Sequence, residues 1–268
     1  MDALQTTGEL FVPGYRNYLI FADEAGTRGG AYYGFGSLWL PWERRGDFAA
    51  QIRQLRCAHD FDGVVRWANV DERPMFFVQL VDWFFQRRWL MFHMLVVRQQ
   101  DVDLALHGGD ESLGRRRHFA MFLRRKIGDF GSTRDKSYHL RVASTTRDMT
   151  PNLSNRVNRS LETEIGSRCL ASVIERRIAE ASALGLSDVF VGAVMQARSD
   201  ELATPGQRRV SDEIADCLGW RDLCADTFPR VDKFNIWRFW DGTDRRLEPT
   251  RHVTLRYPTG PLVRRQSG

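Results

Sequence analysis

The stretch NYLIFADEAGTRGGAYYGFGSLWLP, residues 17–41, decides the fold. Its first part, residues 18–22, is a short apolar run that predicts a central strand, and residues 31–40 predict a second strand. The link AGTRGG contains the glycines typical of a turn, so we expect the two strands to form an antiparallel hairpin. Asp23 and Glu24 lie where the first strand ends, and two adjacent carboxylates beside so apolar a segment require a physical reason.

Strand alternation separates the two carboxylates. Asp23 continues the row of Leu19 and Phe21, which we expect to face the core, whereas Glu24 points to the other face of the sheet. A partly desolvated carboxylate costs free energy unless it is paired, hydrogen-bonded or bound to a metal. The alternative is a turn aspartate that accepts backbone N–H groups of the AGTRGG loop.

A second acidic residue interrupts an apolar pattern in LGLSDVFVGAVMQ, residues 184–196. On a helix, Asp188 shares a face with Leu184, Val191 and Met195, and Gly192 on that face would let the helix pack closely on a sheet. The alternative is that Asp188 caps a helix that begins only at residue 189. Two carboxylates at one edge of a sheet would suit a hard divalent cation such as Mg²⁺, which takes oxygen ligands.

The rest of the pattern alternates between helical and extended periodicity. It predicts helices over residues 44–58, 74–87, 115–127, 153–165, 184–198 and 208–218, and strands over residues 64–67, 89–97, 139–145, 173–180 and within 233–240. This mixture indicates an α/β fold with a mixed sheet, a first antiparallel hairpin and flanking helices. We interpret residues 1–200 as a core domain and residues 201–268 as a C-terminal extension with a basic tail.

Composition bounds the class of protein. Hydrophobic residues make up 43% and charged residues 27% of the 268 residues, which is typical of a soluble globular protein. The sequence has no apolar run of membrane-spanning length, its start lacks a secretory pattern, and its four cysteines lack metal-finger spacing. We therefore expect a cytoplasmic protein with no membrane partner.

The basic residues permit a polyanionic partner. The net charge is +5, and only three of the 39 basic residues are lysine, a bias that either a GC-rich genome or phosphate-binding arginines would produce. Arg117 and Arg124 belong to a basic face of the helix predicted over residues 115–127, which either contacts nucleic acid or is simply solvated. Trp237 and Trp240 either stack on bases or pack in the core.

Three segments carry a resemblance. YLIFADEAGTRGG resembles the opening of a bacterial family known as domain of unknown function 3800, whose members begin with an apolar strand and an Asp-Glu-Ser-Gly motif. VVRWANV followed by FFVQLVDWFF resembles the Lys-Trp segment and next helix of that family, with Arg66 in place of lysine. LGLSDVFVGAV resembles its late helix, with the aspartate at Asp188. The similarity extends loosely over residues 17–200.

The resemblance implies a ribonuclease-H-like mixed sheet whose first three strands are antiparallel. It also implies a site for Mg²⁺ or Mn²⁺ in which Asp23 and Asp188 are metal ligands, Glu24 assists in catalysis and Arg66 holds a phosphate. The function that this site implies is that of a divalent-metal-dependent nuclease or related phosphodiester-cleaving hydrolase, with water as the nucleophile.

The sequence also departs from the family pattern. Ala25 replaces the serine of the motif, and the segment after residue 143 offers Ser144 and Thr145, with Asp148 only further on. No glutamate precedes Arg66, so the site has one or two ligands fewer than the family pattern. The alternative function is an inactive ribonuclease-H-like module that binds a protein or nucleic-acid partner in a bacterial defence or toxin system, and a homo-oligomer is compatible with both.

Overall fold

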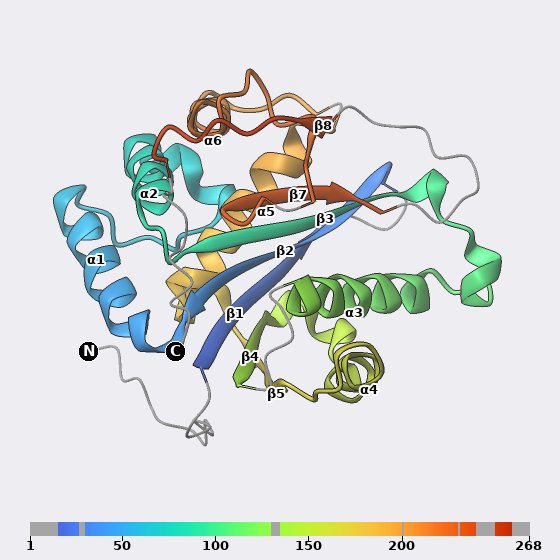
Figure 1. The fold of residues 1–268 in the computed structure, drawn as a ribbon. Coiled ribbons are helices and arrows are strands. Elements are labelled where there is room, and N and C mark those ends of the chain that lie inside the picture. Colours follow the sequence, from blue (N-terminus) through green and yellow to red (C-terminus); the bar gives the residue numbers. More distant parts are fainter. Residues whose placement is uncertain are drawn as a thin grey trace.

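The computed structural model describes residues 16–26, 30–129, 135–199, 201–229, 231–239 and 250–258. Within these ranges, six strands form one mixed sheet in the order β5-β4-β1-β2-β3-β7 (Figure 1). The strands are β1 (Arg16–Ala25), β2 (Tyr32–Pro41), β3 (Met91–Arg98), β4 (Lys136–Ala143), β5 (Leu170–Arg176) and β7 (Phe234–Arg238). The short strands β6 (Asp226–Thr227) and β8 (Thr250–Arg251) pair separately.

The strand directions confirm the predicted mixed sheet. Strand β2 runs antiparallel to both of its neighbours, β1 and β3, and β4, β5 and β7 join in parallel with their neighbours. The predicted hairpin is therefore formed by β1 and β2, with Asp23 opposite Gly36. The α/β class predicted from the sequence is confirmed.

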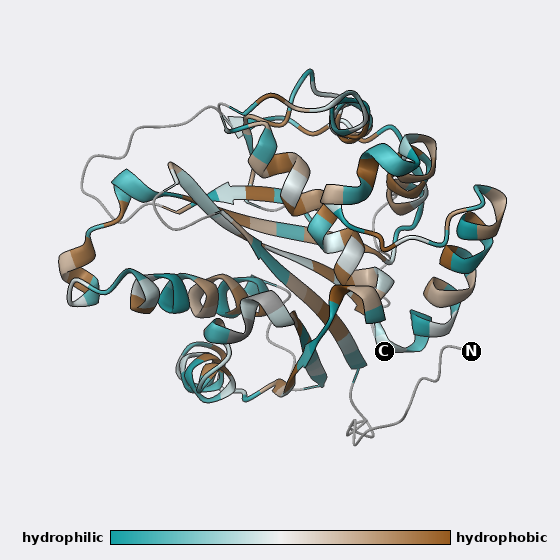
Figure 2. Ribbon diagram, turned by 180° about the vertical axis from the view of Figure 1, so that it is seen from behind, coloured by the Kyte–Doolittle hydropathy of each residue, from teal (hydrophilic) through white to brown (hydrophobic). Residues whose placement is uncertain are grey.

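Helices cover both faces of the sheet. Figure 1 shows α3 and α4 on one face and α1, α2, α5 and α6 on the other. The helices are α1 (Arg45–Ala58), α2 (Pro74–Gln86), α3 (Glu111–Asp129), α4 (Leu153–Ile165), α5 (Ser182–Gln196) and α6 (Pro205–Leu218). Each overlaps a helix predicted from the sequence. Figure 2 shows hydrophobic segments on the central strands and alternating hydrophobic and hydrophilic turns along α3, as expected of a helix with one face on a sheet.

Strand alternation divides the core into two layers. On β2, Leu38 and Leu40 face the layer that contains α2 and α5, while Phe35 and Trp39 face the layer that contains α3. Because both faces of the central strands are covered, these strands are apolar on both sides, which is why their sequence looks like a continuous apolar run.

Helix α5 packs unusually close to the sheet at Gly36. The helix lies across β1 and β2, and a Cβ atom at Gly36 would lie 2.1 Å from Cγ2 of Val191. Any larger residue at this position would force α5 away from the sheet. Gly36 thus sets how closely α5, and with it Asp188, approaches the sheet.

Some predictions at the edges of elements were wrong. Residues 64–66 are not a strand but lead into a 3-10 helix, Trp67–Glu72, because this segment packs against α5 and not beside another strand. Strand β5 begins and ends earlier than the predicted range of 173–180, and β4 ends at Ala143.

The region after residue 200, expected as an extension, contributes to the main fold. Its strand β7 is the edge strand beside β3, and its helix α6 packs on α2. No helix in the described part of the chain is long and apolar enough to cross a membrane.

We predict that Gly36→Ala lowers the free energy of unfolding by about 1–3 kcal/mol, because the added methyl overpacks the contact with Val191. Gly46→Ala is the matched control, since nothing lies within 4 Å of a Cβ atom there, and the change should stabilise helix α1 by up to about 1 kcal/mol. Urea denaturation measures both. Equal effects of the two substitutions would contradict this account of the packing.

Candidate functional site

The structure brings Asp23 and Asp188 together. Asp23 lies near the end of β1 and Asp188 lies in the second turn of α5, and their carboxyl groups are close enough to hydrogen-bond to each other. Asp23 is only 2% exposed, and Asp188 is partly buried. The convergence of these two side chains, predicted from the sequence, is confirmed; that they bind a metal stays a prediction.

Three further groups hold the pair in place. The backbone N–H of Glu24 donates to Oδ1 of Asp23 at 2.9 Å, and the hydroxyl of Thr146 donates to the same oxygen at 3.3 Å. The backbone N–H of Trp67 donates to Oδ2 of Asp188 at 2.5 Å. Each aspartate therefore has a fixed orientation before any ligand binds.

The sequence left two local alternatives, a helix cap at Asp188 and a turn aspartate at Asp23. Asp188 is not a helix cap, because α5 begins at Ser182. Asp23 accepts a backbone N–H from its own neighbour Glu24, and residues 27–29 of the turn lie outside the described residues. Both carboxyls instead interact with a partner distant in the sequence.

Two glycines of α5 explain how the Trp67 N–H reaches Asp188. A Cβ atom at Gly185 would lie 2.1 Å from the backbone oxygen of Val65, and one at Gly192 would lie 2.2 Å from Cγ of Trp67. The segment from Val65 to Trp67 therefore lies directly against the helix. The prediction that Gly192 faces the sheet was wrong, since this glycine faces Trp67.

The environment favours a shared proton on the pair when no cation is bound. Burial, together with the neighbouring charge of Asp188, raises the pKa of Asp23 to about 7. Burial also raises the pKa of Asp188, although the Trp67 N–H and the charge of Arg66 oppose this. Two carboxyls so placed cannot both be ionised cheaply, and the site would favour a positive charge between them.

Arg66 is the one predicted phosphate-binding residue that lies beside the pair. Its side chain is exposed and its charge acts on Asp188, where it opposes the rise in pKa. Arg117 and Arg124 lie elsewhere, on α3 across the sheet from α5.

The two α3 arginines have structural partners. Arg117 donates to the carbonyl oxygen of Leu106 at 2.5 Å, and Arg124 forms an ion pair with Glu164 that joins α3 to α4. These partners tie both side chains to neighbouring segments of the protein, and that the basic face of α3 binds nucleic acid stays a prediction.

Glu24 does not join Asp23 and Asp188. It lies on the opposite face of β1, where Arg115 of α3 approaches it at 3.5 Å. It lines a hollow of about 400 Å³ together with residues 26, 112, 115, 116, 148, 149 and 151. The idea that Glu24 assists at the same site does not fit this geometry, because consecutive strand residues point to opposite faces.

Of the two tryptophans considered for base stacking, Trp237 and Trp240, the structure describes only Trp237. Trp237 packs near Phe122, with the ammonium group of Lys126 5.8 Å from the ring centroid, so it belongs to the interface of β7 with α3. Trp240 lies outside the described residues.

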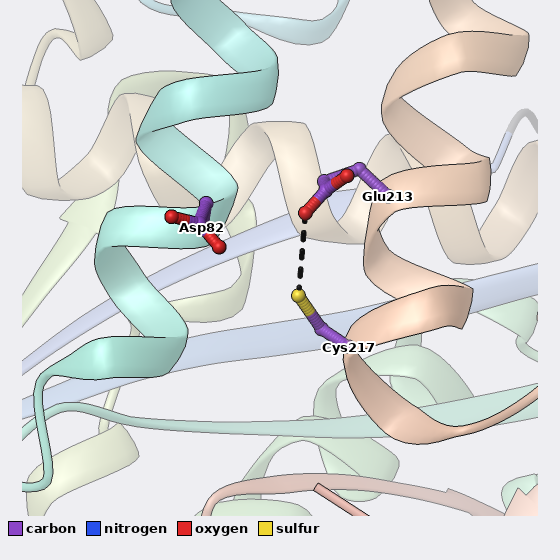
Figure 3. Close-up of side chains that lie close together, drawn as sticks. All are labelled: Asp82, Glu213 and Cys217. Carbon is purple, nitrogen blue, oxygen red and sulfur yellow. Dashed lines mark hydrogen bonds between the residues drawn. The ribbon is translucent and has the colours of Figure 1, made fainter. Parts of the chain in front are cut away.

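A different group has three potential metal ligands. Asp82 of α2 and Glu213 and Cys217 of α6 offer ligand atoms within 4.8 Å of one another (Figure 3). Among the described residues this is the one such group of three, so no third carboxylate, histidine or cysteine joins Asp23 and Asp188 there.

The chemistry of the group of three does not favour a metal. Arg256 donates to Asp82 at 3.4 Å and to Glu213 at 2.5 Å, and the Tyr257 hydroxyl donates to Asp82 at 2.6 Å. Burial raises the pKa of the Cys217 thiol, whereas metal ligation requires the thiolate. The group instead attaches the segment of residues 250–258 to α2 and α6.

Sequence reasoning missed two groups at the acidic pair. Thr146 follows β4, but nothing in STTRD distinguishes its hydroxyl from those of Ser144 and Thr145. The Trp67 N–H was invisible because a backbone group carries no sequence signal. The glycines at 185 and 192, seven residues apart on one helix, were the available hint.

Comparison with known proteins adds no assignment. No protein-family model matches the chain, and no curated protein matches it.

We predict that the stability of the metal-free protein falls as the pH rises from about 4 to about 7. The raised pKa of Asp23 means that the folded state holds a proton that the unfolded state has lost, so this contribution is complete below the unfolded pKa and disappears through the folded one. Asp23→Asn removes it. Between pH 5 and 8 the wild-type melting temperature should fall by about 4 °C more than that of the variant. Parallel curves would contradict the shared proton.

Proposed function

We propose that the protein is a divalent-metal-dependent nuclease or related phosphodiester-cleaving enzyme in which Asp23 and Asp188 hold Mg²⁺ or Mn²⁺. One observation carries the proposal: two carboxyls, one buried and one partly buried, from a strand end and a helix far apart in sequence, meet with their orientations already fixed. A structural ion pair would need a cation there, and the nearest basic side chain acting on the pair, Arg66, is exposed.

The donor set fits a hard cation. Mg²⁺ binds oxygen ligands and commonly uses one or two carboxylates, with water and substrate phosphate completing its coordination. Burial and the neighbouring charge of Asp188 raise the pKa of Asp23, and a bound cation would offset the cost of ionising it. When bound, such an ion polarises a phosphate oxygen and lowers the pKa of a coordinated water.

The surrounding residues would orient the reaction. Thr146 and the Trp67 N–H hold one oxygen of each aspartate, which leaves the others for ligation. Arg66, exposed beside Asp188, would bind a phosphate of the substrate. Glu24 has no role as a ligand in this proposal, because it faces the hollow near Arg115.

The proposal extends to the family. We propose that the chain is a ribonuclease-H-like protein related to domain of unknown function 3800. Support comes from the three antiparallel first strands, which the resemblance implies, and from the position of Asp188 on a helix that packs over β1.

The first test is cleavage of labelled RNA and DNA in the presence of Mg²⁺ or Mn²⁺. We expect metal-dependent loss of at least one substrate, and Asp23→Ala should lower the rate at least about 100-fold, because even groups that only support metal ligands contribute 10–100-fold. Asp212→Ala, an exposed aspartate of α6, is the matched control and should cleave normally. Activity that survives chelation, or is equal in both variants, would reject the proposed nuclease.

The second candidate function is an inactive ribonuclease-H-like module that binds a protein or nucleic-acid partner. It is favoured by one observation: in the part of the chain that the structure describes, no third ligand lies within reach of the pair. The side chain that reaches Asp23 from the segment after β4 offers a hydroxyl, that of Thr146, and not a carboxylate.

Calorimetric titration with Mn²⁺ separates the two functions. The enzyme should bind Mn²⁺, and Asp188→Asn should abolish binding because one of only two carboxylates is lost. Asp82→Asn tests the group of three on α2 and α6 and should leave binding unchanged. Absence of Mn²⁺ binding by the wild type would favour the inactive module, whereas loss of binding in Asp82→Asn alone would place the ion at the other group.

A further inference from the structure

Trp67 differs from the other tryptophans that the structure describes. The structure describes seven tryptophans, and the six other than Trp67 each contact another aromatic ring or a cation, as with Trp39 and His93, or Trp42 and Arg45. Trp67 has neither kind of partner within the described ranges, and its ring is only partly buried. The ring packs against the hydrophobic core that includes α5, and the rest of it leaves an aromatic surface exposed at this point of the molecule.

That point is beside the acidic pair. The backbone N–H of Trp67 donates to Asp188, and the ring begins at the Gly192 contact, one helical turn beyond Asp188 on α5. The ring therefore lies along the same face of α5 as the carboxyl that we propose to hold the metal. Two contacts fix the position of the Trp67 ring: the hydrogen bond from its own backbone N–H to Asp188 and the packing of the side chain against Gly192.

The indole N–H also faces outward. It makes no hydrogen bond with the described residues, and it is not among their buried polar atoms that lack a partner. Arg66, the preceding residue, is exposed, and its positive charge acts on Asp188. An aromatic surface and a guanidinium thus adjoin the acidic pair, a combination that suits a base and its phosphate.

We propose that Trp67 is a stacking platform for a nucleobase next to the phosphate held at the acidic pair, and that the substrate is a single-stranded nucleic acid. The proposal rests on the proposed function. A base inside a duplex has no free face, because its neighbours cover both sides, so stacking on a protein ring requires a single strand or an unstacked base.

The test is binding, measured by fluorescence anisotropy with Ca²⁺ in place of Mg²⁺ or Mn²⁺, so that the acidic pair has a hard cation with oxygen ligands while the ions proposed for cleavage are absent. The probes are labelled single strands of RNA and DNA of about ten nucleotides, within the range of single-strand sites. Each has an abasic version of the same length and charge, and a duplex form. We expect the wild type to bind the better of the two strands ~10-fold more tightly than its abasic version, a difference that the stacking of one base supports.

Substitutions assign that preference to Trp67. Trp67→Leu should bind normal and abasic strands alike, whereas Trp67→Phe should keep most of the preference because it keeps a ring. Both variants retain the backbone N–H that holds Asp188, and a Mn²⁺ titration of each shows whether the acidic pair is still formed. Trp89→Leu is the matched control, because Trp89 is another partly buried tryptophan, preceding β3 at the opposite end of the sheet.

The outcomes separate this inference from the proposed enzyme. The role of Trp67 would be overturned if the wild type bound normal and abasic strands equally, bound single strands and duplexes equally, or bound no strand. It would also be overturned if Trp67→Leu kept the preference for the normal strand. Cleavage that persists alongside any of these results would leave the enzyme intact without the platform. Preference for the normal strand without metal-dependent cleavage would leave the platform intact and remove the enzyme.

Discussion

The site depends on one constraint, the close packing of α5 between the sheet and the segment of residues 65–67. On the sheet side, Gly36 lets Val191 approach to a distance that no side chain would allow. On the other side, Gly185 and Gly192 admit Val65 and Trp67 against the helix backbone. Asp188 lies on the helix between these contacts, so packing of the helix places its carboxyl beside Asp23. This packing offsets the free-energy cost of desolvating both carboxyls. Packing of this kind can hold two like charges together because close-packed interiors resist displacement.

The adjacent carboxylates at the end of β1 have different physical situations. Asp23 is buried on the face of the sheet that α5 covers, where its neighbour is another carboxyl. Glu24 is on the opposite face, where Arg115 approaches it. Strand geometry alone causes this division, and it limits the acidic pair to two carboxylates in the described part of the chain. In the proposed function, a site of this composition would need neighbouring groups to bind a substrate, and Arg66 and Trp67 would be those groups.

The sequence predicted most of the fold and the centre of the site because both depend on periodicity. The apolar rows of β1 and α5 carry one acidic residue each, Asp23 and Asp188, and an acidic residue in such a row marks a buried charge. What the sequence could not predict depended on contacts between distant segments. VVRW has the composition of a strand, yet it packs against two glycines of α5. Arg117 and Arg124 belong to a basic helix face, yet both are committed to neighbouring elements. Resemblance to a family suggested the residues of the site, while the structure decided which of them meet.

The central claim is that Asp23 and Asp188 form one cation site, and anomalous X-ray scattering from crystals grown with Mn²⁺ tests it most directly. The account predicts a single strong anomalous peak between the two carboxyls, with an oxygen of each within about 2.0–2.6 Å, the range of hard-cation ligation. The same peak should be missing from crystals of Asp188→Asn. A map without a peak between the two carboxyls, or with its main peak at Asp82, Glu213 and Cys217, would contradict the account.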